Sequence, residues 1–513
     1  MKLSASKISS FLSIATFLTI VVLAGVFASQ LPFRDPDTCW ILGLGKWIIE
    51  HGQLPAVDPF SSNLCSYAQI GKDQPLMQYQ WLIELIFYRV FSLGQEVALL
   101  LFIGIILAMA FVVLPLRLLI FSRSGLLAFL VLSLGLYAST LRFIARPEIF
   151  SSLFLASLLL LNCLYVNASK RMKVILSLGC GLTMGLWANS HMLFPLGIIT
   201  LAALSIARLF ETSSDWKSKI TDAFLPLVAG ILATLVNPWG IGLWIYEFNL
   251  LVSPVSFANA DHLPPVWTRS NSISQLLCLA LAGIFVLSKQ KFKEWRNGLP
   301  ACFIYLLSCA LAYKYAKLLP ESYVLACASM GLAGIQAGIT NESSARIPIM
   351  QWNKLLAEKL QKSKNVILSL SFISFLSGTA LGLKIMGIPA IPGTTEFFVP
   401  PFKAIAYLNQ HGIPEGRLLN EGLYGSVMTW HMKKCPDLFM DSRFSMFEPE
   451  LVSEYEHTLL CEGDWQSVLK KYKIAWVFMP KAMPLAVALS KDSNWHQVYL
   501  DEEAVILSRS TDK

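Results

Sequence analysis

Two carboxylates begin the part of the sequence best suited to do chemistry. Asp35 and Asp37 follow directly after an apolar run over residues 9–30, separated only by a proline. A carboxylate at a membrane boundary can take a proton as a general base or bind a divalent cation. Asp before Pro is also a common way to begin a helix, so both residues could instead be cap and turn residues. The other acids of this region are Asp58 and Glu84.

Basic side chains and one histidine recur between later apolar segments. They are Arg142, Arg146, Lys314, Lys317 and His191. On the topology derived below, the four cations lie on the side of the membrane that positive residues usually avoid. Binding an anionic phosphate would explain them, because arginine holds phosphate through two parallel hydrogen bonds. Lipid head groups, or ion pairs with Glu148 or Glu321, are alternatives. His191 could be an acid, a base, a metal ligand or an interface residue.

The elements that must position these residues are membrane-spanning helices. Of the 513 residues, 55% are hydrophobic and 14% are charged, whereas a soluble protein carries about 25% charged residues. Apolar segments long enough to cross a bilayer predict a polytopic α-helical membrane protein with roughly eleven spans. The segments are 9–30, 97–121, 125–141, 147–166, 172–188, 192–210, 222–237, 271–288, 298–313, 318–339 and 366–387.

The distribution of lysine and arginine predicts how the chain is oriented. With a cytoplasmic N-terminus, every expected inside segment is basic, as membrane topology requires. These segments contain Lys2, Lys7, Arg117, Arg123, Lys170, Arg171, Lys173, Arg208, Lys217, Lys219, Lys289, Lys291, Lys293, Arg296, Arg346, Lys354, Lys359, Lys362 and Lys364. The net charge of +8 is therefore a topology signal and does not indicate nucleic-acid binding. An odd number of spans places the C-terminal tail on the non-cytoplasmic side.

Two parts of the chain lie outside the expected spans. The first outside loop, 31–96, ends in an amphipathic piece over 81–91 that is expected to lie at the membrane surface. Glu84 in this piece either faces a cavity or extends toward the surface. Residues 391–513 alternate helical and strand-like patterns, which predicts a small extracytoplasmic α/β domain after a transmembrane bundle over 1–390. The expected strands are 417–420, 438–440, 474–479, 497–500 and 504–507.

The cysteines outside the expected spans form two pairs. Cys39 and Cys65 share the first outside loop, and Cys435 and Cys461 share the tail. In an oxidising compartment each pair would fit a disulfide, and four free thiols are the alternative.

Several common catalytic motifs are missing from suitable positions. No HExxH, paired CxxC, P-loop or glycine-rich dinucleotide motif occurs in a convincing context. Their absence argues against a zinc protease, an ATPase or an enzyme with a Rossmann nucleotide-sugar site.

A set of short motifs spread over nearly the whole chain resembles the GT-C-fold glycosyltransferases. This superfamily includes protein O-mannosyltransferases and the aminoarabinose transferases of lipid A, and the likeness is closest to uncharacterised bacterial members. The motifs are Asp35-Pro-Asp37-Thr-Cys-Trp40, Gly45-Lys-Trp47-Ile, Pro55-Ala-Val-Asp58-Pro-Phe-Ser61, Trp81-Leu-Ile-Glu84, Arg146-Pro147-Glu148-Ile-Phe-Ser, Trp187-Ala-Asn189-Ser-His191, Asn237-Pro-Trp-Gly240, Asn420-Glu-Gly-Leu-Tyr-Gly425 and Met440-Asp441-Ser-Arg443.

The resemblance implies an enzyme of the bacterial inner membrane that uses a polyprenyl-phosphate-linked sugar. Its acceptor would be an extracytoplasmic glycolipid, polysaccharide or protein. The role of base falls by motif to Asp35 or Asp37, and the donor phosphate would contact outside cations, with Arg146 the closest motif match. Single displacement with a carboxylate base implies inversion at the anomeric carbon. Whether a divalent cation takes part is not specified by the motifs.

Two other functions remain open at this point. A non-catalytic membrane scaffold for envelope polysaccharide assembly would need the tail and not the aspartates. A transporter or flippase usually carries polar residues at mid-membrane and repeated halves. Here the polar residues gather at the ends of apolar segments and no repeat is visible. Asp441 and Arg443 in the tail are read as an ion pair more readily than as an acceptor site.

Overall fold

The computed structural model describes residues 35–63, 77–210, 216–252, 269–290, 296–338 and 398–510. They belong to two compact units. Unit 1 takes the described residues within Glu96–Asn237 and Ala260–Thr394, and unit 2 those within Leu31–Gln95, Pro238–Asn259 and Thr395–Lys513. The first outside loop thus groups with the C-terminal tail. The expected spans 9–30 and 366–387, and Cys65, lie outside the described residues.

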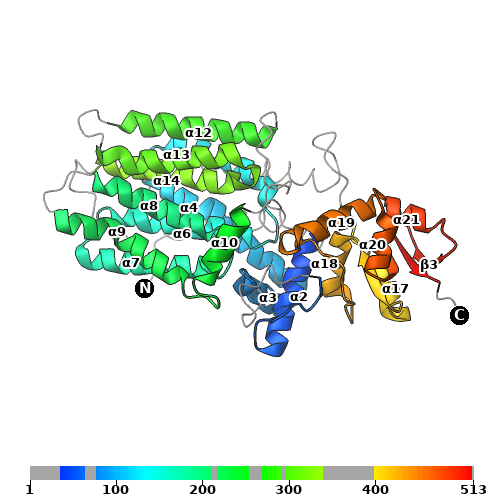
Figure 1. Ribbon diagram of the computed structural model, residues 1–513. Coiled ribbons are helices and arrows are strands. Elements are labelled where there is room, and N and C mark those ends of the chain that lie inside the picture. The colour runs from blue at the N-terminus through cyan, green and yellow to red at the C-terminus, as the bar shows by residue number, and fades with distance from the viewer. Residues whose placement is uncertain are drawn as a thin grey trace, which may run out of the picture. The chain divides into compact units, whose positions relative to one another are not determined.

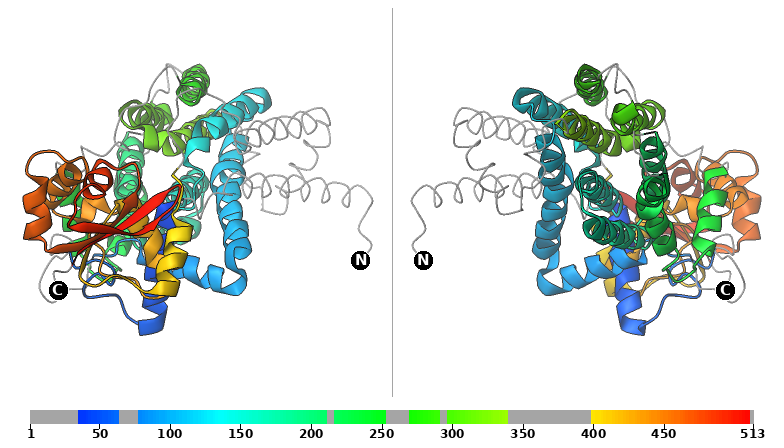
Figure 2. Two further views of the ribbon diagram at one scale, coloured as in Figure 1. Left: turned by 90° about the vertical axis from the view of Figure 1, so that its right-hand side faces the viewer. Right: turned by 90° about the vertical axis from the view of Figure 1, so that its left-hand side faces the viewer.

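Unit 1 is a bundle of apolar helices that run side by side (Figure 1) and are seen end-on in Figure 2. Each expected span within the described residues corresponds to helix here. The helices are the second half of α3 (Trp81–Ala108), the π-helix Met109–Val113, α4 (Leu114–Ile120), α5 (Gly125–Ser139), α6 (Glu148–Tyr165), α7 (Lys170–Ala188), α8 (Phe194–Leu209), α9 (Trp216–Thr234), α12 (Ser270–Lys289), α13 (Leu299–Lys314) and α14 (Leu319–Gly338). Short 3-10 turns, η3 (Thr140–Arg142) and η6 (Ala316–Leu318), precede α6 and α14.

Four segments of the described chain are long and apolar enough to cross a membrane. They are Trp81–Ile120, Glu148–Tyr165, Ser270–Lys289 and Ala316–Ala337, and Gly125–Ser139 and Phe194–Leu209 are shorter apolar helices. In water such helices would expose many large apolar side chains, as Leu101, Ile105 and Ile284 do here. That exposure suits helices that face lipid. The number of spans in the whole chain stays a prediction.

The helix α3 is broken in the middle. Gly94 and Gln95 leave helical geometry, with φ of −169° and 54°, so residues 81–93 and 96–108 are separate helical pieces. Leu93 and Val97 beside the break are 85% and 66% exposed. The break lies between the amphipathic piece over 81–91 and the expected span 97–121.

Unit 2 contains a mixed four-stranded sheet in the order β1-β2-β4-β3. Strand β1 (Arg417–Asn420) pairs parallel with β2 (Ile474–Pro480), and β4 (Ala504–Arg509) pairs antiparallel with both β2 and β3 (Trp495–Leu500). The expected strands match except for 438–440. The helices of this unit are α2 (Pro36–His51), the first half of α3, α10 (Gly242–Val252), α17 (Phe402–His411), α18 (Gly422–His431), α19 (Pro449–Leu459), α20 (Trp465–Lys471) and α21 (Pro484–Leu489), with the 3-10 turn Phe444–Met446.

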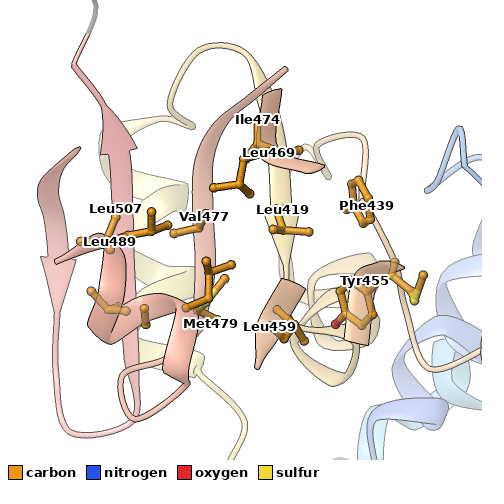
Figure 3. Close-up of a cluster of buried hydrophobic side chains, with 14 of the residues drawn as sticks. Leu419, Phe439, Tyr455, Leu459, Leu469, Ile474, Val477, Met479, Leu489 and Leu507 are labelled. Carbon is orange, nitrogen blue, oxygen red and sulfur yellow. The ribbon is translucent and has the colours of Figure 1, made fainter. Parts of the chain in front are cut away.

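Both faces of the sheet are covered. On one face, side chains of β1, β2 and β4 such as Leu419, Val477 and Leu507 pack against α19, α20 and α21 (Figure 3). On the other face, Trp476 and Phe478 pack against α17 and α18, and Cys39 of α2 joins this cluster. Each fully buried large apolar side chain contributes about 1.5–3 kcal/mol. The alternation along β2 thus builds two cores from one strand.

The first outside loop is docked onto the tail by hydrogen bonds. Ser61 Oγ donates to the Leu438 carbonyl at 2.8 Å, and the Ser62 amide and hydroxyl both bond to the Asp437 carboxylate at 2.7 and 2.6 Å. These bonds explain why 438–440 is not a strand. Leu438 and Phe439 donate their amides to Phe60 and to the Asn420 side chain, at 2.8 and 2.9 Å, instead of to a neighbouring strand.

The tail cysteines do not form a disulfide. Cys39, Cys435 and Cys461 are all free thiols. Burial raises the pKa of the Cys435 thiol, and the nearby carboxylates Asp441 and Asp58 raise it further, which disfavours the reactive thiolate.

Candidate functional site

Asp35 begins helix α2 as its N-cap. Its side-chain Oδ1 accepts the Asp37 amide at 3.2 Å, and Pro36 takes the first helical position. Both features are typical of a helix start, since proline there loses no backbone hydrogen bond. Asp35 is therefore a helix cap, which the sequence offered as the alternative to a catalytic role.

Asp37 lies in the first turn of α2, where its carboxylate is held from two sides. Its Oδ1 accepts the indole N–H of Trp40 at 3.2 Å and the hydroxyl of Ser442. Trp40 follows one turn later on the same helix, whereas Ser442 comes from the tail. Asp37 is only partly buried. A carboxylate fixed in orientation and still accessible has the geometry that a general base needs.

Arg443 joins two buried aspartates. It contacts Asp58 Oδ2 through Nη1 and Asp441 Oδ2 through Nη2, both at 2.5 Å, and all three side chains are at most 3% exposed. Burial alone would lower the pKa of Arg443, but the two carboxylates raise it well above its usual value. Asp58 also accepts the amides of Phe60 and Ser61 at 2.9 and 2.8 Å. Asp58 and Asp441 are therefore structural acids that fix the loop to the tail.

Two further acids are buried close by. Glu84 is fully buried, which excludes a side chain that extends to the surface, and neither of its oxygens has a hydrogen-bond partner among the described residues. It lies within electrostatic range of Arg443 and Asp58. Glu247 of α10 is 4% exposed, with Oε1 likewise lacking a hydrogen-bond partner in the described chain, and burial raises its pKa well above the usual value. At neutral pH this shift favours the protonated acid.

Tyr79 links these acids electrostatically. Burial raises the pKa of its hydroxyl, and Glu247, Glu84 and Asp37 raise it further. Its ring stacks on Tyr246 with centroids 6.0 Å apart. We call Asp37, Asp58, Glu84, Glu247 and Asp441 the acidic cluster of unit 2.

Close helix packing brings Glu84 beside α2. A Cβ on Gly45 would lie 2.1 Å from the Glu84 carbonyl oxygen, so only glycine permits this approach of α2 and α3. Asp37 and Gly45 of α2 and Trp81 and Glu84 of α3 therefore belong to two helices that pack directly against each other.

The acidic cluster does not fit a metal ion. No group of three or more His, Cys, Asp or Glu side chains within the described residues could hold one. Asp58 and Asp441, which could have been ligands, are occupied by Arg443. We therefore derive no catalytic step through a metal.

A second polar group lies at one end of the unit 1 bundle. Arg142 Nη2 contacts Glu148 Oε2 at 2.9 Å, and Ser152 Oγ donates to Glu321 Oε1 at 2.7 Å. These contacts connect the turn before α6 with the start of α14. The ion pair between Arg142 and Glu148 is one of the alternatives that the sequence left open. We call Arg142, Glu148, His191, Lys317 and Glu321 the polar end of unit 1.

His191 belongs to the same end through a short chain of hydrogen bonds. Trp187 Nε1 donates to Ser151 Oγ at 2.9 Å, and Ser151 Oγ lies 2.9 Å from His191 Nδ1, which also accepts the Leu193 amide at 3.3 Å. Nδ1 is therefore the acceptor and Nε2 carries the proton. Burial, with Lys317 and Arg142 nearby, lowers the pKa of His191 to about 3. His191 is thus a neutral hydrogen-bonding residue at physiological pH.

The remaining predicted cations differ in their surroundings. Arg146 is partly buried in the turn next to Arg142, where its amide bonds to the Ile144 carbonyl at 2.9 Å. Lys317 is close enough to His191 to affect it electrostatically. Lys314 is exposed and its ammonium lies over the Tyr315 ring at 5.0 Å, so no described contact ties it to the polar end.

Sequence reasoning assigned no role to Glu247 of the acidic cluster or to the two serines that contact Asp37 and His191. Glu247 stands among apolar residues, and only its isolation between Tyr246 and Phe248 could have marked it. Ser442 and Ser151 lie inside two of the quoted motifs, yet nothing in those motifs marked either serine for a role of its own. Serine is common in loops and apolar helices, and their partners Asp37 and His191 lie far away in the sequence.

Comparisons with known proteins agree on the fold. No protein-family model matches the sequence, and no curated protein does. The structure of ArnT from Cupriavidus metallidurans bound to undecaprenyl phosphate is similar, with a TM-score of 0.53 and 14% identity over 98% of each chain. So is the oligosaccharyltransferase AglB from Archaeoglobus fulgidus in complex with an inhibitory peptide and a dolichol-phosphate, with a TM-score of 0.53 and 12% identity, over 91% of this chain and 69% of that one. The chain therefore has the GT-C fold, which is a polytopic membrane fold.

Proposed function

We propose that this protein is a membrane glycosyltransferase. It moves a sugar from a polyprenyl-phosphate donor to an acceptor on the non-cytoplasmic side of the membrane, where the acceptor is a glycolipid, a polysaccharide or a protein. Two solved structures with the same fold hold undecaprenyl phosphate and a dolichol-phosphate. The single observation that carries the proposal for this chain is the Asp37 carboxylate, fixed by Trp40 and Ser442.

In the proposed reaction Asp37 is the base. It removes the proton from the acceptor hydroxyl as the oxygen attacks the anomeric carbon, and the bond from that carbon to the phosphate oxygen breaks. One displacement inverts the anomeric configuration. A well-placed base contributes roughly 10²–10⁴-fold to the rate. Asp35 is not assigned this role, because its side chain caps α2.

The polyprenyl phosphate that leaves gains negative charge and needs cations. We assign this contact to Arg142, Arg146 and Lys317, which recur in the turns before α6 and α14. Arginine suits a phosphate through its bidentate geometry. His191, neutral at physiological pH, would contribute its Nε2–H as a hydrogen-bond donor to the same group. Glu148 orients Arg142 through their ion pair at 2.9 Å, and Ser151 orients His191 through its hydroxyl.

The location follows from the same proposal. A cytoplasmic N-terminus with roughly eleven spans would place the first outside loop and the C-terminal tail on the non-cytoplasmic face. An inner membrane of a bacterial cell provides such a face and the polyprenyl-phosphate sugars. The protein then needs no nucleotide site, in keeping with the motifs absent from its sequence.

The test compares cells that carry wild-type protein, Asp37→Asn or Asp35→Asn in place of the chromosomal copy. Asparagine keeps the size of the side chain and still caps a helix. We expect Asp37→Asn to lose the glycan or glycolipid products of the gene, as a deletion does, and Asp35→Asn to keep them. Mass spectrometry of envelope lipids and glycans reads the result, with immunoblots to show equal protein levels. Unchanged products in Asp37→Asn would remove the catalytic role.

A scaffold for envelope polysaccharide assembly is the second candidate. The bonds of Ser61 and Ser62 to the tail favour it, because they are structural contacts made by the outside loop. Deleting the tail would not separate the two functions, since the tail also supplies Ser442 to Asp37. The substitution Asp37→Asn does separate them, because a scaffold would tolerate it.

A further inference from the structure

An open groove of about 740 Å³ lies on unit 2, beyond the C-terminal end of α17. It is bordered by α20 and by residues of β2, β3 and β4. Figure 1 labels α17, α20 and β3. None of its lining residues belongs to the acidic cluster. The side chains that matter here are Tyr407, His411, Lys470, Lys473, His496 and Arg509.

The groove is positively charged. Lys470, Lys473 and Arg509 are exposed and form no salt bridge within the described part of the chain, and Glu415 is the only acid in the lining. The neighbouring Lys471, which does not line the groove, is instead paired with Glu454 at 2.6 Å. Cations that converge in a concave surface without acidic partners create a potential that attracts anions.

An aromatic surface lies beside these cations. The Tyr407 ring stacks on His411 with centroids 4.2 Å apart and an interplanar angle of 19°, and its centroid is 4.9 Å from that of Tyr499. Helix α17 ends at His411 because Gly412 turns the chain away with a φ of 90°. His411 is exposed, so the face of its ring that is turned away from Tyr407 can meet the flat apolar side of a pyranose.

We propose that this groove binds a saccharide that carries a phosphate or carboxylate group. The anion would be held by Lys470, Lys473 and Arg509, and the sugar ring would pack on the exposed ring of His411, which Tyr407 supports. A volume of about 740 Å³ is within the range of small-ligand sites and accommodates more than one sugar unit. The inference concerns binding alone, so it holds whether or not the chain transfers a sugar.

The test measures binding to the full chain in lipid nanodiscs by isothermal titration calorimetry. The probes are a phosphorylated disaccharide, a disaccharide containing a hexuronate, the matching neutral disaccharide, inorganic phosphate and a single-stranded oligonucleotide. The groove variant is Lys470→Gln/Lys473→Gln/Arg509→Gln. The control variant is Lys433→Gln/Lys481→Gln/Lys491→Gln, which removes the same charge from exposed residues of unit 2 outside the groove.

We expect one or both anionic disaccharides to bind, the neutral one not to bind and inorganic phosphate to bind more weakly. The groove variant should weaken this binding roughly tenfold, since each exposed charge contact is worth a modest amount. The control and Asp37→Asn should bind as wild type does, which keeps this result separate from transfer activity. Tighter binding of the phosphorylated disaccharide would identify phosphate as the recognised group. Tighter binding of the disaccharide with a hexuronate would identify carboxylate.

Three results would overturn the proposal. The first is equal weakening in the groove and control variants, which would mean a general charge effect. The second is binding of the neutral disaccharide as tight as that of the anionic ones. The third is binding of a single-stranded oligonucleotide as tight as that of the disaccharides, which would make the groove a site for any polyanion.

Discussion

At the scale of single residues, two aspartates separated by one proline, Asp35 and Asp37, have different uses. Asp35 accepts a backbone amide and begins a helix, whereas Asp37 accepts side-chain donors from Trp40 and Ser442. The sequence pattern Asp-Pro-Asp could not assign these uses, because either residue can cap. In the structure Asp35 caps the helix just before the proline at the first helical position, and Asp37 lies one turn before Trp40 on the same helix.

The cap gives a prediction about stability. Replacing Asp35 with alanine should lower the free energy of unfolding by about 0.5–2 kcal/mol, because the first turn of α2 loses an acceptor. Asp35→Asn should remain close to wild type, since asparagine caps equally well. Thermal unfolding of the purified protein in detergent measures both. Equal losses for alanine and asparagine would show that the charge, and not the cap, is what matters.

His191 gives a prediction about pH. Its pKa is about 3 in the folded chain against 6.5 for an ordinary histidine, so between these values only the unfolded chain binds the proton. The stability that the neutral ring provides is present above about pH 6.5 and is lost as the pH falls toward 3. Near pH 5 the loss should be about 1–2 kcal/mol, allowing for partial exposure.

The check uses the variant His191→Gln, which cannot titrate. Its unfolding midpoint should fall less than that of wild type when the pH is lowered from neutral to about 5. If wild type and His191→Gln lose stability in parallel, His191 is not buried as a neutral ring.

At the scale of elements, an ion-pair triad joins the first outside loop to the tail. Replacing Arg443 with methionine would leave Asp58 and Asp441 buried without their partner. We expect unfolding to become easier by roughly 3–5 kcal/mol. The triple variant Asp58→Asn/Arg443→Met/Asp441→Asn should recover most of this loss, because no buried charge remains. A triple variant as unstable as Arg443→Met would contradict an electrostatic cause.

Most elements could be predicted from the sequence, and the misses have physical reasons. The strands of the sheet have apolar runs between turn residues, and the bundle helices have long apolar segments. Residues 438–440 look like a strand, yet their amides bond to Phe60 and Asn420. Contacts far apart in the sequence decide this case, and no pattern in one segment contains them.

At the scale of the whole molecule, the bond between Asp37 and Ser442 constrains topology. Both residues belong to unit 2 and must lie on the same side of the membrane. In a chain whose native cysteines are replaced, Glu50→Cys and Lys491→Cys should react with a membrane-impermeant thiol reagent added outside intact cells. Lys289→Cys, at the expected cytoplasmic end of α12, should react only after the membrane is opened. Glu50→Cys and Lys491→Cys reacting from opposite sides would contradict the structure of unit 2.

The membrane nature of the chain could be predicted from composition and segment length, and the GT-C fold from the resemblance of its motifs. Most acids and cations that the sequence singled out lie in the acidic cluster or at the polar end, whereas Asp35 caps α2, Arg146 lies in the turn next to Arg142 and Lys314 is exposed. What the sequence could not supply is the pairing between groups, such as Arg443 with Asp58 or Ser151 with His191. These pairings separate the structural acids Asp58 and Asp441 from Asp37, which we propose as the base.

We propose Asp37 as the base in sugar transfer from a polyprenyl-phosphate donor. This role can be measured with purified protein in liposomes that contain lipid-linked sugars and acceptors extracted from the source membranes. Mass spectrometry then follows the release of free polyprenyl phosphate with time. We expect release by wild type and by Asp35→Asn, with Asp37→Asn slower by roughly 10²-fold or more. Release by Asp37→Asn at the wild-type rate would contradict this role.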